Sequence, residues 1–183
     1  MTLWNQDEYI RAWGFAAEAH AGQTVTGTEM SYLWHIGLVS TEAMAVTTQE
    51  AVKAPDLLIL CAVLHDVIED TPRTFEDIST AFGPEVADGV SALTKNENLP
   101  TKDEQMADSL KRIRRQPKEI RMVKLCDRIA NLQPPPAHWD ASRIKRYREE
   151  SRLILDTLGE ASPYLSARLA EKIRIYSNQY AED

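Results

Sequence analysis

Long apolar runs, cysteine, glycine and excess positive charge are all scarce in this sequence. The longest uninterrupted apolar stretch, Leu57–Leu64, has eight residues, whereas a helix that crosses a bilayer needs about 18. The chain has 21 Lys and Arg against 28 Asp and Glu, a net charge of −7, which argues against nucleic acid and anionic membranes as partners. The sequence therefore predicts neither a membrane protein nor a nucleic-acid-binding protein, and a small molecule is the expected partner.

Only two cysteines are present, Cys61 and Cys126, and both lie in apolar segments. Such positions are typical of buried, reduced thiols. The first residues also lack the basic and then apolar pattern of a secretory signal. We therefore expect a cytoplasmic protein without disulfides, whose oligomeric state the sequence does not indicate.

Apolar residues recur at spacings of three and four along most of the chain, and alternating strand-type runs are nearly absent. This pattern predicts helices. The length, the 43% of hydrophobic residues and the lack of a linker predict one all-α helical bundle that covers residues 1–183 as a single domain. The predicted helices are 7–21, 32–47, 56–70, 74–81, 84–94, 103–115, 119–132, 140–158 and 163–180.

Charge is unevenly distributed along the chain. Residues 1–100 carry four Lys and Arg against 15 Asp and Glu, whereas residues 101–183 carry 17 against 13. This polarity suits a site that binds a cation on one side and a polyanion on the other. Solvated helix faces are the alternative, and for the charge asymmetry taken alone they are the better explanation.

The strongest chemical signal is an apolar helix that ends in four ionisable residues. His65 and Asp66 are about 100° apart around a helix, so both could reach one cation at its C-terminal end. Glu69 and Asp70 follow one turn later. A bound cation lowers the pKa of its water, and a nearby carboxylate can take the proton. Glu69 and Asp70 are therefore the expected catalytic carboxylates.

Two more residues, His35 and Asp127, would complete the shell of such an ion. His35 lies in the first turn of an apolar helix, and Asp127 is flanked by apolar residues in the middle of another. Taken singly, His35 is better explained as a core histidine. Asp127, which is followed by Arg128, is better explained as a salt-bridge partner. Two imidazoles and two carboxylates together suit Mn²⁺, Fe²⁺ or Zn²⁺ better than Ca²⁺.

The order His35, His65-Asp66, Asp127 resembles the HD superfamily of metal-dependent phosphohydrolases. Longer segments are similar to the hydrolase domain of RelA/SpoT enzymes, which remove the 3′-pyrophosphate from (p)ppGpp, and the C-terminal part is similar to stand-alone small alarmone hydrolases. The segments that carry this resemblance are Ala19–Gln23, His65–Thr71, Leu93–Lys95, Val123–Leu132 and the set Trp139, Arg143 and Tyr147.

The resemblance implies a role for each matching residue. His35, His65, Asp66 and Asp127 would hold the metal, which is usually Mn²⁺ in this family, and Glu69 and Asp70 would position or deprotonate the attacking water. The implied substrate contacts are Lys124, Asn131, Arg143, Tyr147 and Lys102, with Lys95 as a further candidate. Ordinary surface residues are the alternative for several of these contacts, and a solvated face is the better explanation of the basic run at residues 111–115.

The sequence departs from the family pattern at two places. Thr24, Val25 and Thr26 stand where the family often has an arginine that stacks on guanine, and Ile36 stands where a proline is common. We therefore expect pyrophosphohydrolase activity with a relaxed base preference, on (p)ppApp as well as (p)ppGpp. The alternatives are an HD phosphatase that acts on NADPH or another nucleotide, and a non-catalytic nucleotide sensor.

Overall fold

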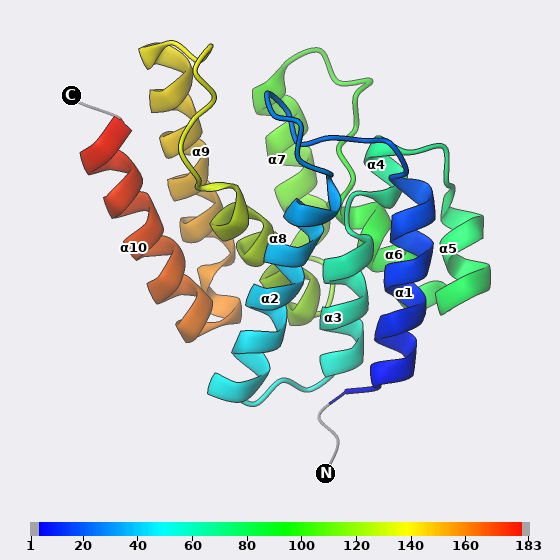
Figure 1. Cartoon of the computed structure of the whole chain (residues 1–183). Coiled ribbons are helices and arrows are strands. Elements are labelled where there is room, and N and C mark those ends of the chain that lie inside the picture. Colours follow the sequence, from blue (N-terminus) through cyan, green and yellow to red (C-terminus); the bar gives the residue numbers. More distant parts are fainter. Residues whose placement is uncertain (1–3, 181–183) are drawn as a thin grey trace.

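A computed structural model of the chain describes residues 4–180, and within them it contains α-helices and no β-strand (Figure 1). The all-α prediction is confirmed. With one exception, the predicted helices begin and end within two residues of the observed ones. The helices are α1 Gln6–Ala19, α2 Leu33–Gln49, α3 Pro55–Leu64, α4 Val67–Asp70, α5 Phe75–Phe82, α6 Pro84–Leu93, α7 Lys102–Ile113, α8 Lys118–Asn131, α9 Ala141–Leu158 and α10 Pro163–Tyr180, with a 3-10 turn at Gly159–Ala161.

The exception is the predicted helix 56–70, which the structure breaks into α3 and α4. Asp66 leaves the helical backbone, with φ −102° and ψ 1°. Its carboxylate accepts a hydrogen bond from Tyr32, and the ring of His65 bonds back to the Ala62 carbonyl. A continuous helix would carry Asp66 about 100° around the axis from His65. The break instead turns both side chains in one direction.

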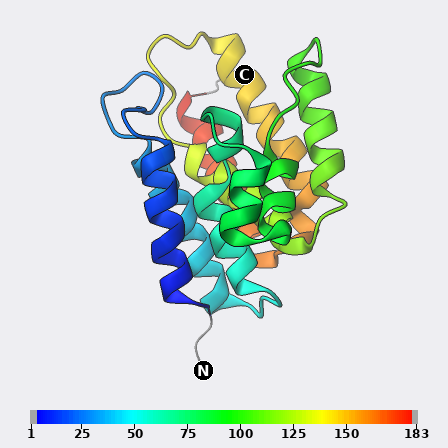
Figure 2. The same cartoon turned by 90° about the vertical axis from the view of Figure 1, so that its right-hand side faces the viewer.

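Helix α3 is the centre of the bundle, because all its residues from Leu57 to Leu64 are buried. It packs against α1, α2, α6 and α8. The remaining helices flank this core, with α9 and α10 on one side and α5 on the other (Figures 1 and 2). The apolar run at residues 57–64 is thus a core helix, and none of the helices described is long and apolar enough to cross a membrane.

Close packing around α6 depends on a glycine. A Cβ at Gly89 would lie 2.5 Å from Ile120 Cδ1 and 2.9 Å from Cys61 Sγ. Both Cys61 and Cys126 are free and buried, as predicted. Helix α6 therefore reaches the layer formed by α3 and α8 only because this position lacks a side chain.

Candidate metal centre

Helices α2, α3 and α8 each bring a predicted ligand to one point. His35 lies in the first turn of α2, His65 directly follows α3, and Asp127 lies in the last turns of α8. The Nε2 atoms of the two histidines are 3.2 Å apart, and Asp127 Oδ1 is 3.6 Å from His35 Nε2 and 3.9 Å from His65 Nε2. All three side chains are buried.

Asp66 joins these three from the break between α3 and α4. Its Oδ2 lies 2.9 Å from His65 Nε2 and 3.6 Å from His35 Nε2. Around an ion about 2.1 Å from each donor atom, adjacent donor atoms are about 3.0–3.4 Å apart. The four side chains, called the His/Asp cluster below, therefore have a spacing that a single transition-metal ion would fit.

The hydrogen bonding of His65 also favours a cation at the centre of the cluster. Its Nδ1 lies 2.9 Å from the Ala62 carbonyl oxygen, which can only accept, so Nδ1 carries the proton. In the neutral ring Nε2 then carries a lone pair, which faces the carboxylates of Asp66 and Asp127. Although burial lowers the pKa of His65, these carboxylates raise it to about 9. Positive charge at the centre of the cluster is therefore favourable, and a proton or a metal ion can provide it.

Asp127 has two further partners on its own helix. Lys124 Nζ lies 2.8 Å from Asp127 Oδ2, and Asn131 Nδ2 lies 2.5 Å from Oδ1. Burial opposes ionisation of Asp127, but the charges of Lys124, His65 and His35 together outweigh it and lower the pKa of the carboxyl. Lys124, Asp127 and Asn131 thus share one face of α8, and the two outer residues support Asp127. Their contact with a nucleotide stays a prediction.

The two expected catalytic carboxylates have different surroundings. Glu69 accepts hydrogen bonds from the Lys95 backbone N–H at 2.8 Å and from Lys95 Nζ at 2.5 Å, one on each oxygen. Asp70 is exposed. Loss of hydration nevertheless raises its pKa, and the charges of Asp66 and Glu69 raise it further. Glu69 is thus fixed by Lys95, whereas Asp70 faces solvent and has a raised pKa.

Among the other predicted substrate contacts, Arg143 and Tyr147 lie together on α9. The guanidinium of Arg143 lies 4.4 Å from the ring centre of Trp139, whose ring meets Tyr147 edge-on at 5.1 Å. Burial raises the pKa of Tyr147, and the charge of Asp127 contributes to the rise. Tyr147 thus packs against Trp139 and Arg128, and its contact with a nucleotide, like that of Arg143, stays a prediction.

Lys102, by contrast, makes no hydrogen bond or ion pair to the cluster within residues 4–180. Its Nζ bonds to Gln105 on its own helix at 3.2 Å. In the basic run Lys111, Arg114 and Arg115 are exposed, as a solvated face implies, and only Arg112 departs from that interpretation. It donates to the carbonyls of Ser91, Ala92 and Thr94 at 2.7–2.9 Å. It therefore closes the C-terminal end of α6, directly before the segment that carries Lys95.

Sequence reasoning missed two residues that lie behind the cluster. Tyr32 precedes α2, and its hydroxyl donates to Asp66 Oδ2. Burial and the nearby Asp66 carboxylate raise the pKa of Tyr32, so the hydroxyl stays protonated. The ring of His20 stacks on Tyr32. The available signal was the position of Tyr32, one helical turn before His35, which places both side chains on one face.

Thr24 lies in the loop between α1 and α2. Gly22, with φ 79°, begins the loop, and Thr24 pairs with Ser31 in an antiparallel bridge. A Cβ at Gly27 would lie 3.6 Å from Pro136 Cβ, so the tip of the loop meets the proline-rich connector before α9. The chain thus has a hydroxyl side chain, and no guanidinium, in the part of the loop where the resemblance implied a base-stacking arginine.

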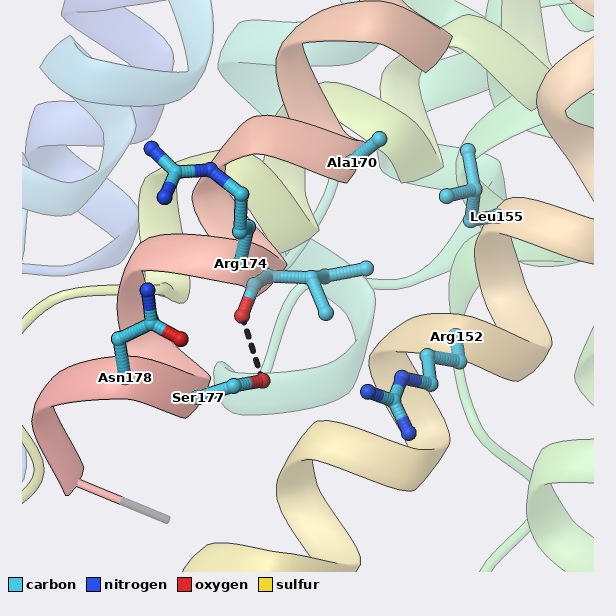
Figure 3. A pocket seen from close by; sticks show the side chains of 7 residues that line it. Arg152, Leu155, Ala170, Arg174, Ser177 and Asn178 are labelled. Carbon is cyan, nitrogen blue, oxygen red and sulfur yellow. Dashed lines mark hydrogen bonds between the residues drawn. The ribbon is translucent and has the colours of Figure 1, made fainter. Parts of the chain in front are cut away.

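A separate groove of about 350 Å³ lies between α9 and α10 (Figure 3). Leu155, Ala170 and Ile173 form its apolar wall, and Arg152 and Arg174 lie at its edge. None of its lining residues belongs to the His/Asp cluster or to the predicted substrate contacts. The candidate active site is therefore the cluster and its neighbours.

Comparison with known proteins places these features in a family context. The sequence profile of a family described as HD domain matches residues 12–162. The chain is 27% identical to the guanosine-3′,5′-bis(diphosphate) 3′-pyrophosphohydrolase MESH1 of Drosophila melanogaster, over 95% of this chain and 97% of that protein. It is 34% identical to the bifunctional (p)ppGpp synthase/hydrolase SpoT of Escherichia coli, over 67% of this chain but only 17% of SpoT. A solved structure described as a metazoan ortholog of SpoT that hydrolyses ppGpp matches with a TM-score of 0.79 and 26% identity, over 92% of this chain and 94% of that one.

Proposed function

The chain belongs to the HD-domain family, and from this premise we propose that it is a metal-dependent hydrolase that removes the 3′-pyrophosphate of an alarmone nucleotide. The products would be pyrophosphate and GDP or GTP, or ADP or ATP. The observation that carries this proposal is the convergence of two imidazoles and two carboxylates beside an acidic pair. The names of the relatives, which are (p)ppGpp pyrophosphohydrolases, support the choice of substrate. A domain over the whole of residues 1–183 stays a prediction.

The metal would be held by His35, His65, Asp66 and Asp127. Their mixed nitrogen and oxygen donors and their spacing suit a divalent transition metal, and Mn²⁺ is our choice among Mn²⁺, Fe²⁺ and Zn²⁺. When bound, the ion would supply positive charge at the reacting phosphorus and lower the pKa of a water molecule. Around it, His65 is oriented by the Ala62 carbonyl.

The two acidic residues, Glu69 and Asp70, would have different roles in the reaction. Asp70 would take the proton of the attacking water, because it is exposed and its pKa is raised. Glu69 would act mainly through its position, because Lys95 binds both of its oxygens. The two residues are therefore expected to differ in what their substitution costs.

Basic and polar side chains beside the cluster would bind the substrate. A 3′,5′-bis-diphosphate carries several negative charges, and hydrolysis adds negative charge to the phosphoryl and leaving oxygens. Fixed cations facing the ion lower the barrier by stabilising that charge. We assign binding of the substrate to Lys124, Asn131, Arg143 and Tyr147, with Lys102 as an outer contact, and stabilisation of the developing charge to Lys124, which lies beside Asp127.

The site would bind nucleotides with guanine and with adenine with little preference for either base. Thr24 and the residues after it offer no planar cation to stack on guanine. We therefore propose that (p)ppApp is accepted beside (p)ppGpp.

The test is an initial-rate comparison of ppGpp, ppApp and NADPH with Mn²⁺-loaded protein, in which pyrophosphate and phosphate are measured separately. Pyrophosphate release from ppGpp and ppApp at similar rates is the expected result. Strict guanine preference would refute the role given to Thr24. Phosphate release from NADPH alone would identify a phosphatase, and bound metal without any turnover would identify a nucleotide sensor.

A further inference from the structure

The hydroxyl of Tyr32 reaches the oxygen of Asp66 that faces the histidines. It donates to Asp66 Oδ2, the atom that lies 2.9 Å from His65 Nε2 and 3.6 Å from His35 Nε2. A carboxylate oxygen has two lone pairs, so Oδ2 can accept this hydrogen bond and still point toward an ion. The hydrogen bond therefore fixes which oxygen of Asp66 faces the cluster.

Tyr32 is itself held from behind by His20 and Gln23. The rings of His20 and Tyr32 stack with centroids 4.9 Å apart and an angle of 29° between their planes. Gln23 holds both residues, because its side-chain oxygen lies 2.6 Å from His20 Nδ1 and its backbone carbonyl accepts from the Tyr32 N–H at 2.9 Å.

His20 is only 2% exposed, and its Nε2 has no hydrogen-bond partner among residues 4–180. The orientation of its ring is therefore set by the Gln23 contact and by the stack on Tyr32. A buried imidazole nitrogen without a hydrogen-bond partner costs free energy, so such a group is rare without a role. Here it limits the tilt and rotation of the Tyr32 ring.

We propose that Tyr32, held in place by His20, is a positioning residue that orients Asp66 for metal binding. This inference rests on the proposed metal site and adds residues that touch neither the metal nor the substrate. Outer hydrogen bonds to metal ligands typically change metal affinity by about 10- to 100-fold. Removal of the Tyr32 hydroxyl would let the Asp66 carboxylate rotate and would weaken binding by a factor in this range.

The test is the affinity for Mn²⁺, measured by titration calorimetry on the metal-free full chain. We expect Tyr32→Phe to bind Mn²⁺ about 10- to 100-fold more weakly than the wild type, with an unchanged helical circular dichroism spectrum. The matched control is Tyr176→Phe, because the Tyr176 hydroxyl is also buried but has no hydrogen-bond partner within the described residues. This control should bind Mn²⁺ like the wild type.

Two substitutions of His20 test whether its ring holds Tyr32 in place. His20→Phe keeps an aromatic ring against Tyr32 and should weaken Mn²⁺ binding less than His20→Ala does. Equal Mn²⁺ affinity for Tyr32→Phe and the wild type would overturn the inference, and equal affinity for His20→Ala would remove His20 from it. A wild-type protein that binds no Mn²⁺ would refute the proposed metal site as well, so the two failures are distinguishable.

Discussion

Substitution of Asp70 by asparagine should abolish most turnover and stabilise the metal-free protein at the same time. Asparagine has the same shape as aspartate but cannot take a proton from water at neutral pH. A positioned general base typically contributes about 10²- to 10⁴-fold, so Asp70→Asn should raise the activation free energy by about 2.7–5.4 kcal/mol. Because the cluster ligands are unchanged, Mn²⁺ binding should remain.

The gain in stability follows from the direction of the pKa shift. Neighbouring carboxylates and loss of hydration raise the pKa of Asp70 in the folded state, so its ionised form favours the unfolded chain. This cost appears as the pH rises through the usual carboxyl range and is present at neutral pH. Since Asp70 is exposed, solvent screening limits the cost to about 0.2–1 kcal/mol. A chain of this length gains roughly 2–4 °C in Tm per kcal/mol.

Two measurements test this prediction together. Pyrophosphate release from ppGpp gives kcat, and thermal unfolding in EDTA gives the Tm of the metal-free protein. The control is Asp156→Asn, an exposed carboxylate near the end of α9, at the opposite end of the bundle from the break between α3 and α4 (Figure 1). A kcat within tenfold of the wild type would show that Asp70 is not the base, and a lower Tm would refute the reasoning about its charge.

Four further substitutions test other parts of the structure. Asp127→Ala should weaken Mn²⁺ binding by more than about 100-fold in calorimetry, because a direct ligand matters more than an outer contact; unchanged affinity would remove it from the shell. Arg143→Ala should raise KM for ppGpp about tenfold with little change in kcat in steady-state assays, and a selective loss of kcat would contradict its role in binding. Arg112→Met should lower the free energy of unfolding in urea by about 1.5–3 kcal/mol, since three carbonyls lose a charged donor. Gly89→Ala should lower the same free energy by about 1–2 kcal/mol, because the clash with Ile120 exceeds the gain in helix propensity; a stabilised variant would mean that the core rearranges easily.

Helix content and helix ends were predictable because they depend on local sequence. Periodic apolar residues indicate each helix, and prolines and capping residues mark its boundaries. Thr74 and Thr101, for example, each form a capping box that starts α5 or α7. The break after α3 was not predictable in this way. It is accompanied by the contact between Asp66 and Tyr32, residues that are 34 positions apart and that local sequence patterns do not relate.

The residues of the candidate site were predicted better than their contacts. The order of His35, His65-Asp66 and Asp127 was enough to expect that they meet, and the structure brings them together. Spacing along a helix does not say what a long side chain binds. The sequence therefore predicted a solvated Arg112, although its side chain donates to three carbonyls around the end of α6.

The short helix α4 has a mechanical consequence for the site. The Asp70 N–H donates to the Asp66 carbonyl at 2.9 Å, so one helical turn joins the proposed metal ligand to the proposed base. Because both residues lie on this one turn, a shift of the turn moves both of them together. The alignment of water and proton acceptor would therefore tolerate thermal motion of the surrounding helices, whereas insertion of a single residue between positions 66 and 70 would destroy it.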